Sequence, residues 1–208
     1  MSNSVTSQLT MGQCATLACL LEATAPKPGN VHRGADFEDL TFSDFVASAV
    51  AIAPAMQQVR QTGVGAAILA AITATRQFVA TNTNLGTVLL LAPLAAVNLA
   101  QGWKAGIAVV LANLTPADAV DIYSAIRAAN PGGLTPVDEM DINTCPPDSL
   151  LDAMRLAADR DLVARQYVDQ FSTVFDRVAP ALAAGTGRGW SLTDTIIHTQ
   201  IGLMSDFP

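Results

Sequence analysis

Helical hydrophobic periodicity continues through nearly the whole of this 208-residue chain, and it restricts the fold more than any other feature. Runs of alternating β-branched residues between turns, which are typical of strands, are missing. No internal repeat or linker divides the chain. The sequence therefore predicts an all-α fold in a single domain over 1–208, with about nine or ten helices. The expected helices are 9–23, 41–60, 65–78, 84–99, 104–113, 115–129, 149–158, 161–184 and one that begins after 191.

Capping residues define several of these helix ends. Thr41 and Asp44 form a pair that resembles a capping box, with aspartate in place of the usual glutamate. Pro54 lies in the helix that follows and should split or kink it. Thr115 is a capping residue, and Pro116 after it occupies the first helical position, so together they predict a well-defined helix start.

The composition fits many closely packed helices. Half of the residues are hydrophobic, only 14% are charged, and the mean hydropathy is +0.35. Much of the apolar content is alanine, whose small side chain lets helices approach one another. The longest apolar run, 88–97, contains Pro93 and falls short of the ~18 residues of a membrane span. We therefore expect no membrane segment, and the N-terminus lacks the basic start of a signal peptide.

The net charge and the cysteine spacing argue against a nucleic-acid-binding protein and against a disulfide-bonded one. The net charge is −7 and the pI is about 4.5, with no basic run, so nucleic acid is not an expected partner. Cys14, Cys19 and Cys145 have no Cys-x-x-Cys spacing and indicate reduced thiols in a cytoplasmic protein. The expected partners are small molecules, and a homo-oligomer stays open. A phosphorylated ligand would need local Lys or Arg and a divalent cation.

A proline-rich loop over 26–39 carries the densest set of polar side chains. Pro26 and Pro28 stiffen it, and Gly29 permits a positive φ. Its lysine and arginine can neutralise phosphate, and its carboxylates can hold Mg²⁺. The alternative interpretation is a solvated connector whose charges are incidental. The side chains that could touch a nucleotide are Lys27, Asn30, His32, Arg33, Asp36 and Asp39.

Three further polar clusters interrupt the apolar sequence. Asn82 and Asn84 lie in a turn before an apolar helix, where backbone N–H groups could bind phosphate or the turn could simply cap the helix. Asp118 lies in the first turn of a helix that also carries Arg127. Its carboxylate could serve a ligand, or it could simply interact with the helix dipole. The third cluster is the break at 159–161, where carboxylates could hold a metal; Asp161 is also spaced for an ordinary ion pair with a later arginine.

The sequence lacks the motifs of several familiar binding sites. His32 and His198 are the only histidines, so a zinc site is not expected. No Gly-x-x-x-x-Gly-Lys-Ser/Thr motif occurs, which excludes a Walker-type nucleotide site. The glycine-rich stretches 63–65 and 185–189 do not follow strands, so a dinucleotide fingerprint is not supported.

Taken together, the polar clusters resemble the triphosphoribosyl-dephospho-coenzyme A synthase family. The resemblance spans most of the chain in the expected order. It rests on Pro-Lys-Pro-Gly-Asn-Val-His-Arg at 26–33, Asn-Thr-Asn-Leu-Gly at 82–86, Asp-Ala…Tyr…Ala-Ile-Arg at 118–127, Pro-Gly-Gly-Leu at 131–134 and Ala-Asp-Arg-Asp at 158–161.

The resemblance implies an all-helical enzyme with an unusual use of ATP. The anomeric carbon of the ATP ribose is transferred to a ribose hydroxyl of dephospho-coenzyme A, adenine leaves, and the triphosphate stays on the transferred sugar. Family members usually continue beyond the position of Asp206, so the resemblance predicts a chain shortened at its C-terminus. Better-known members read more like Pro-Lys-Pro-Gly-Leu-Val-Asp-Arg and Asn-Thr-His-Lys-Gly, so this sequence is divergent at both motifs, notably at Asn84 and Leu85.

Cleavage of an N-glycosidic bond passes through an oxocarbenium-like transition state, which carboxylates stabilise while a base deprotonates the attacking hydroxyl. We assign residues to three roles on this basis. The predicted catalytic residues are Glu22, Asp118 and Asp161. The predicted nucleotide-binding residues are Lys27, Asn30, His32, Arg33, Asn82, Asn84 and Arg127. The predicted Mg²⁺ ligands are Asp36, Asp39 and Asp159, with Asp161 an alternative to Asp159.

Three other functions stay open at this stage. The acceptor could be the sugar alcohol of a pterin precursor in tetrahydromethanopterin-linked one-carbon metabolism, because divergent sequences of this type resemble proteins of that pathway. An Mg-dependent ADP-ribosyl hydrolase would use the same chemistry with water as acceptor. A helical nucleotide-binding protein without activity is the third. We also expect the proline-rich loop, the Asn-Thr-Asn turn and the break at 159–161 to converge on one pocket.

Overall fold

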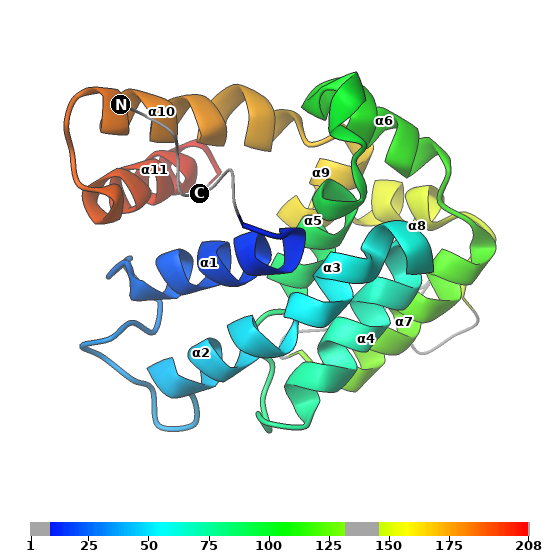
Figure 1. Ribbon diagram of the computed structural model, residues 1–208, viewed down its shortest axis with the longest axis horizontal. Coiled ribbons are helices and arrows are strands. Elements are labelled where there is room, and N and C mark those ends of the chain that lie inside the picture. The colour runs from blue at the N-terminus through cyan, green and yellow to red at the C-terminus, as the bar shows by residue number, and fades with distance from the viewer. Residues whose placement is uncertain (1–8, 132–145, 208) are drawn as a thin grey trace.

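The computed structural model describes residues 9–131 and 146–207, and their regular elements are helices (Figure 1). Only an isolated bridge between His32 and Ala35 has strand-like pairing in these residues. The predicted all-α fold is confirmed. The α-helices are α1 (Met11–Thr24), α2 (Phe42–Ala51), α3 (Ala53–Thr62), α4 (Val64–Arg76), α5 (Leu85–Ala96), α6 (Trp103–Ala112), α7 (Pro116–Ala129), α8 (Leu150–Ala157), α9 (Leu162–Val168), α10 (Ala179–Gly187) and α11 (Leu192–Asp206). A short 3₁₀ turn, η2 (Leu99–Gln101), and a π-helical turn, η3 (Val174–Val178), complete them.

The predicted helix starts are confirmed where capping residues define them. Thr41 begins α2 with a complete capping box, in which the Asp44 side chain bonds back to the Thr41 backbone. Thr115 begins α7 in the same way. Pro54 separates α2 from α3, and the break falls at Ile52. These ends follow from local hydrogen bonding, which a single sequence displays directly.

The single helix expected over 161–184 is wrong. α9 ends at Val168, and Gln170 and Phe171 then adopt positive φ values of 52° and 61°. The Phe171 side chain is fully buried and lies 5.8 Å from the Tyr167 ring, centroid to centroid. A positive φ is costly for a bulky residue, so core packing of this phenylalanine outweighs the helical periodicity. The chain resumes as η3 and α10 in a new direction.

Helices α4 and α7 form the centre of the core and run parallel. The N-terminal turns meet where Gly65 lies against Asp118, and the C-terminal turns meet where Thr75 and Ala129 line a common cavity. A Cβ on Gly65 would lie 2.5 Å from the Asp118 Cα, so only glycine permits this approach. Ile68 and Ile122 on these two helices are fully buried. This pair of helices, called the frame below, supports the polar turns that adjoin its ends.

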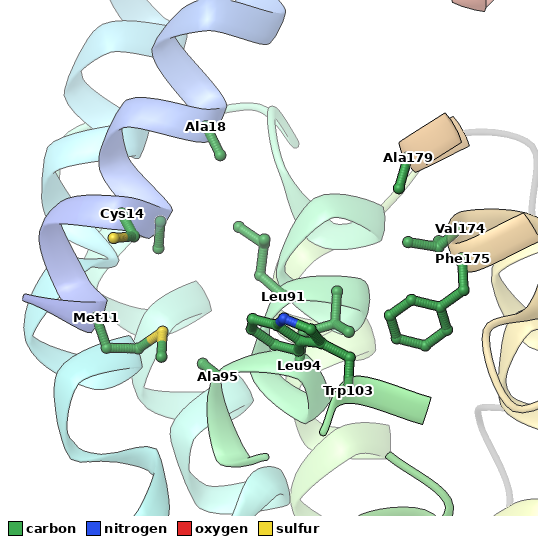
Figure 2. Close-up of a pocket in the computed structure, with 11 residues that line it drawn as sticks. Met11, Cys14, Ala18, Leu91, Leu94, Ala95, Trp103, Val174, Phe175 and Ala179 are labelled. Atoms are coloured by element: carbon green, nitrogen blue, oxygen red, sulfur yellow. The ribbon is translucent and has the colours of Figure 1, made fainter. Parts of the chain in front are cut away.

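The last two helices form a hairpin that projects from the rest of the molecule (Figure 1). Its helices meet at Gly185, where a Cβ would lie 2.6 Å from the Thr195 side chain. Leu192, Ile201 and Met204 on α11 are exposed. Between the base of this hairpin and α1, α5 and α6 lies an apolar cavity of about 370 Å³ (Figure 2). In the part of the chain that the structure describes, no single helix has the length and hydrophobicity to cross a membrane, and α6 and α7, which meet such a criterion only as a pair, are bent by 95° between them.

Candidate functional site

The first turns of α5 and α9 lie side by side. A Cβ on Gly86 would be 3.6 Å from Cγ2 of Val163, and the Tyr167 hydroxyl donates to the Leu89 carbonyl oxygen at 2.7 Å. Both contacts advance in the same direction along the two helices, so α5 and α9 run parallel. The Asn-Thr-Asn turn before α5 and the break before α9 are therefore neighbours. The structure brings together these two predicted clusters, which are about 80 residues apart in the sequence.

The Asn-Thr-Asn turn is tied to three helices. The Asn82 Oδ1 accepts a hydrogen bond from the Leu85 N–H at 3.1 Å, and the hydroxyls of Thr83 and Ser48 are 2.6 Å apart. Asn84 is buried, and its Nδ2 donates to the Thr75 Oγ1 at 3.2 Å. The turn thus contacts α2 and α4 while it leads into α5. A helix N-terminus in this position offers a positive dipole end to an anion.

The end of α7 also adjoins this turn. Ala129 lines the same cavity as Thr81 to Asn84, so the Pro-Gly-Gly-Leu motif starts next to the turn at Pro131; its remaining residues lie outside the described part. Arg127 is exposed near this end of α7, and its guanidinium donates to the Ser124 hydroxyl. The structure therefore places Arg127 in the last turn of α7, the end of the helix that adjoins the turn.

The break before α9 uses Asp161 as a helix cap. Its Oδ1 accepts from the Val163 and Ala164 N–H groups at 2.7 and 3.0 Å. Arg165 does not pair with Asp161; its guanidinium turns back to the carbonyl oxygens of Ala158 and Asp159. The simple intrahelical ion pair is therefore not formed in the structure. Asp159 and Asp161 are both exposed, so their carboxylates can reach a ligand beside α5.

The proline-rich loop does not present Lys27 to a ligand. The side chain of Lys27 is only 4% exposed, its Nζ pairs with the Glu22 Oε1 at 2.8 Å, and it also donates to the Glu22 carbonyl oxygen. The amine thus satisfies a carbonyl at the end of α1 and neutralises Glu22. In this arrangement Lys27 is held away from a phosphate, whereas Glu22 has one oxygen in the ion pair and a side chain that is 44% exposed, so its predicted acid–base role stays a prediction.

Most of the other polar side chains of the loop are exposed, as the prediction of ligand contacts requires. Asn30, Arg33 and Asp39 are exposed, whereas His32 is half-buried and its Nδ1 accepts from the Gly34 N–H at 3.1 Å. The Asp36 Oδ1 accepts from the backbone N–H that begins α2, at 2.6 Å. The loop ends at α2, and about 10 Å of that helix separates it from the contact with the Asn-Thr-Asn turn. An extended nucleoside triphosphate can span that separation.

The predicted metal ligands are not assembled in the structure. Within residues 9–131 and 146–207, no three His, Cys, Asp or Glu side chains gather closely enough to form a ligand set. Asp36 caps α2 from the proline-rich loop, and Asp159 lies at the break before α9. The three carboxylates predicted from sequence belong to two separate places. Any Mg²⁺ site here would take fewer protein ligands.

Asp118 joins α4 to α7 and lies away from the Asn-Thr-Asn turn. Its Oδ1 accepts from the Gly65 N–H at 2.7 Å, and its Oδ2 accepts from the Thr115 N–H at 2.8 Å and from the Thr115 hydroxyl at 2.7 Å. The turn contacts α4 ten residues later, at Thr75, which is about 15 Å along the helix. The geometry gives Asp118 a structural role, and it does not support the predicted acid–base role.

Hydrogen bonding also sets the charge state of Asp118. Partial burial acts to raise its pKa, but the bonds from the Thr115 and Gly65 N–H groups and the Thr115 hydroxyl outweigh burial, so the pKa lies below its ordinary value. A carboxyl with a lowered native pKa stabilises the fold above its unfolded-state pKa of about 3.9. That contribution is lost as the pH falls through the native pKa.

We expect Asp118→Asn to lower the free energy of unfolding at pH 7 by about 1–2 kcal/mol, because the amide cannot accept on both sides. The difference between variant and native protein should shrink as the pH is lowered from about 5 to about 3. Urea denaturation at pH 7, 5 and 3.5 measures it. A difference that stays constant across this range would show that the Asp118 charge does not stabilise the helix pair.

Sequence reasoning missed two residues that position the turn. Ser48 and Thr75 are almost fully buried, and each bonds to the Asn-Thr-Asn turn. Both fall within predicted helices, where a small polar residue is unremarkable. The only available signal was a hydroxyl at a helix position that the periodicity assigns to the core.

The two free cysteines of the described part lie on α1 and are half-buried; Cys145 lies outside that part. Burial, together with the nearby Glu22, raises the pKa of the Cys19 thiol to about 11. The thiolate is the nucleophilic form of cysteine, so Cys19 is unreactive near neutral pH.

The model of the CitG family, described as ATP:dephospho-CoA triphosphoribosyl transferase, matches residues 8–208. The chain belongs to the CitG family. The resemblance that its polar motifs carry is thus confirmed, and the protein is a transferase of small-molecule substrates. No curated protein and no solved structure matches the chain. The matched range of the CitG model contains every cluster described above, including the turn before α5 and the break before α9.

Proposed function

We propose that this CitG-family protein transfers the ribose triphosphate of ATP to a hydroxyl group of an acceptor, dephospho-CoA or a related alcohol, and releases adenine. One observation carries the proposal. Two sequence-distant family motifs, the Asn-Thr-Asn turn and the Ala-Asp-Arg-Asp break, lie side by side at the starts of α5 and α9. This places amides, a helix N-terminus and carboxylates together in a molecule that is otherwise mostly apolar.

Each of these groups suits a different part of the reaction. Asp161 keeps one oxygen on the N–H groups of α9, which fixes its position, and its side chain is otherwise exposed. Its charge suits stabilisation of an oxocarbenium-like sugar or deprotonation of the attacking hydroxyl. The N-terminus of α5 and Arg127 suit the triphosphate. Exposed Arg33 on the proline-rich loop suits its far end.

Magnesium fits this arrangement with few protein ligands. Asp159 is exposed two residues before Asp161, and Mg²⁺ is commonly held by one or two carboxylates together with substrate phosphates, so Asp159 suits the ion while Asp161 serves the sugar. When bound, the ion would neutralise triphosphate charge that this acidic chain would otherwise repel. Asp36 and Asp39 would remain solvent-facing acids of the proline-rich loop.

A second acceptor is considered because one structural feature counts against dephospho-CoA. Leu85 is buried in the core at the position where better-known members carry lysine, so this chain offers no cation there. A charge-assisted contact contributes roughly 1.5–3 kcal/mol, and its absence weakens binding by about one to two decades. The leading alternative to dephospho-CoA is a pterin precursor that carries a sugar alcohol, as in tetrahydromethanopterin synthesis, because divergent sequences of this type resemble proteins of that pathway.

Product analysis tests the reaction and the acceptor together. The protein is incubated with Mg-ATP and either dephospho-CoA or a ribitol-bearing pterin precursor, and products are identified by mass spectrometry. We expect adenine in equal amounts to a triphosphoribosylated acceptor, with the larger kcat/KM for the pterin precursor. Efficient turnover of dephospho-CoA would overturn the altered acceptor and leave the transfer reaction in place. Ribose release from ADP-ribosyl substrates would indicate a hydrolase, and ATP binding without adenine release would indicate an inactive binding protein.

A further inference from the structure

Arg76 is a cation beside the Asn-Thr-Asn turn that lies outside the family motifs. It is exposed in the last turn of α4, and its Nη1 donates to the Ala80 carbonyl oxygen, directly before the turn. Arg76 and residues 81–84 line the same small cavity. The space between them has no room for a water molecule, so these residues form a packed wall in which Arg76 is exposed to solvent.

Most of the hydrogen-bonding capacity of this guanidinium is unused. A guanidinium carries five N–H donors in a flat fork, and the Ala80 carbonyl oxygen takes one of them. Within the described residues no carboxylate pairs with Arg76, whereas carboxylates neutralise other cations, namely Lys27, Lys104, Arg155 and Arg177. The end of α4 favours a cation through the helix dipole, but this leaves the rest of the fork available.

The surroundings of the turn otherwise lack positive charge. Residues 81–84 and helix α5 contain no lysine or arginine, and the whole chain has a net charge of −7. Asn84 makes no capping hydrogen bond at the start of α5, where the dipole end is positive. A cationic side chain for an anion at this helix start must therefore come from a neighbouring helix, and α4 adjoins the turn through Thr75.

Among the parts of ATP, the phosphates suit this group best. The planar fork of arginine matches two oxygens of a phosphate, and the contact is charge-assisted. Adenine and ribose are neutral and gain little from a fixed positive charge. Because the bond to Ala80 already restricts the Arg76 side chain, less conformational entropy is lost when a phosphate binds.

We propose that Arg76 binds the phosphates of ATP, together with the N-terminus of α5 at the Asn-Thr-Asn turn. This inference rests on the proposed use of ATP. It adds a phosphate-binding residue from α4 to the site and leaves Asp161 for the sugar.

Binding of Mg-ATP without an acceptor tests the assignment, with dissociation constants measured by calorimetry. We expect Arg76→Gln to weaken binding about 10- to 100-fold, because a charge-assisted contact is lost. Adenosine, which has no phosphate, should bind both proteins equally. Arg76→Lys keeps the charge without the fork and should fall between them. The loss in Arg76→Gln should shrink as NaCl is raised from about 0.05 to about 0.5 M, since salt screens an exposed charge.

Arg60→Gln is the matched control. Arg60 is likewise an exposed arginine in the last turn of a helix, α3, and it donates to the Val97 carbonyl oxygen. Val97 follows the opposite end of α5 from the Asn-Thr-Asn turn. Both substitutions remove one positive charge and the same kind of hydrogen bond, so thermal denaturation should shift by similar amounts. Only Arg76→Gln should change the binding of ATP.

Three results would overturn the assignment. They are unchanged binding of Mg-ATP by Arg76→Gln, an equal loss for adenosine, which would indicate a distorted turn, and a loss for dephospho-CoA alone, which would place Arg76 at the diphosphate of the acceptor. Turnover separates this inference from the transfer reaction. ATP binding that depends on Arg76, with no adenine released, would support the assignment and refute the transfer. Adenine release with an unchanged KM for ATP in Arg76→Gln would do the reverse.

Discussion

Replacement of Asp161 by asparagine is expected to lower kcat by at least about a hundredfold while leaving the protein folded. The side-chain oxygen that caps α9 survives this change, because asparagine is as good an N-cap as aspartate. The negative charge is lost, and with it the stabilisation of positive charge on the sugar or the base for the attacking hydroxyl. Steady-state kinetics with thermal denaturation of the same sample separate the two effects.

Two further variants sharpen this experiment. Asp161→Ala removes both the cap and the charge, so it should be as inactive and also less stable by about 1 kcal/mol. Asp194→Asn changes a comparable carboxylate in the first turn of α11 and should keep full activity. Unchanged kcat in Asp161→Asn would show that this residue serves only as a helix cap and would move the chemistry elsewhere.

Gly65→Ala is expected to give the largest loss of stability of any single methyl added to the frame. The new Cβ would lie 2.5 Å from the Asp118 Cα and 2.8 Å from its carbonyl oxygen, and these are backbone atoms that cannot rotate away. Relief requires α4 and α7 to separate, which should cost about 3 kcal/mol and weaken the hydrogen bond between Asp118 and Gly65. Urea denaturation measures the loss.

The matched control for this variant is Gly187→Ala. A Cβ at Gly187, at the end of α10, meets no atom within 4 Å, so the change should be neutral or slightly stabilising. Equal effects of the two substitutions would show that the close approach of α4 and α7 does not hold the fold together.

Local signals explain why much of the fold could be predicted. The ends of α2 and α7 depend on hydrogen bonds between residues three apart, such as Thr41 with Asp44, and the sequence shows both partners. The break after Val168 could not be predicted, because it depends on burial of Phe171 among residues distant in sequence. Hydrophobic periodicity does not show which apolar residue will be buried in the core when its burial requires a positive φ.

The candidate site, like the fold, could be predicted from the sequence only in part. Family motifs indicated that the Asn-Thr-Asn turn and the 159–161 break belong together, and the structure places them side by side. The inward turn of Lys27 onto Glu22 could not be foreseen, because it depends on the direction in which the loop leaves α1. The structural use of Asp118 was visible as one of two interpretations, and the contact with Gly65 decides between them.

Doubly labelled ATP tests the central claim most directly. ATP carrying ¹⁴C in adenine and ³²P in the γ-phosphate is incubated with the protein, Mg²⁺ and an acceptor alcohol, and the two labels are followed through separation of the products. We predict that ¹⁴C appears only as free adenine, while an equal amount of ³²P moves to the acceptor with the sugar. Release of ³²P as phosphate or pyrophosphate, with ¹⁴C left in a nucleotide, would contradict transfer of the ribose triphosphate.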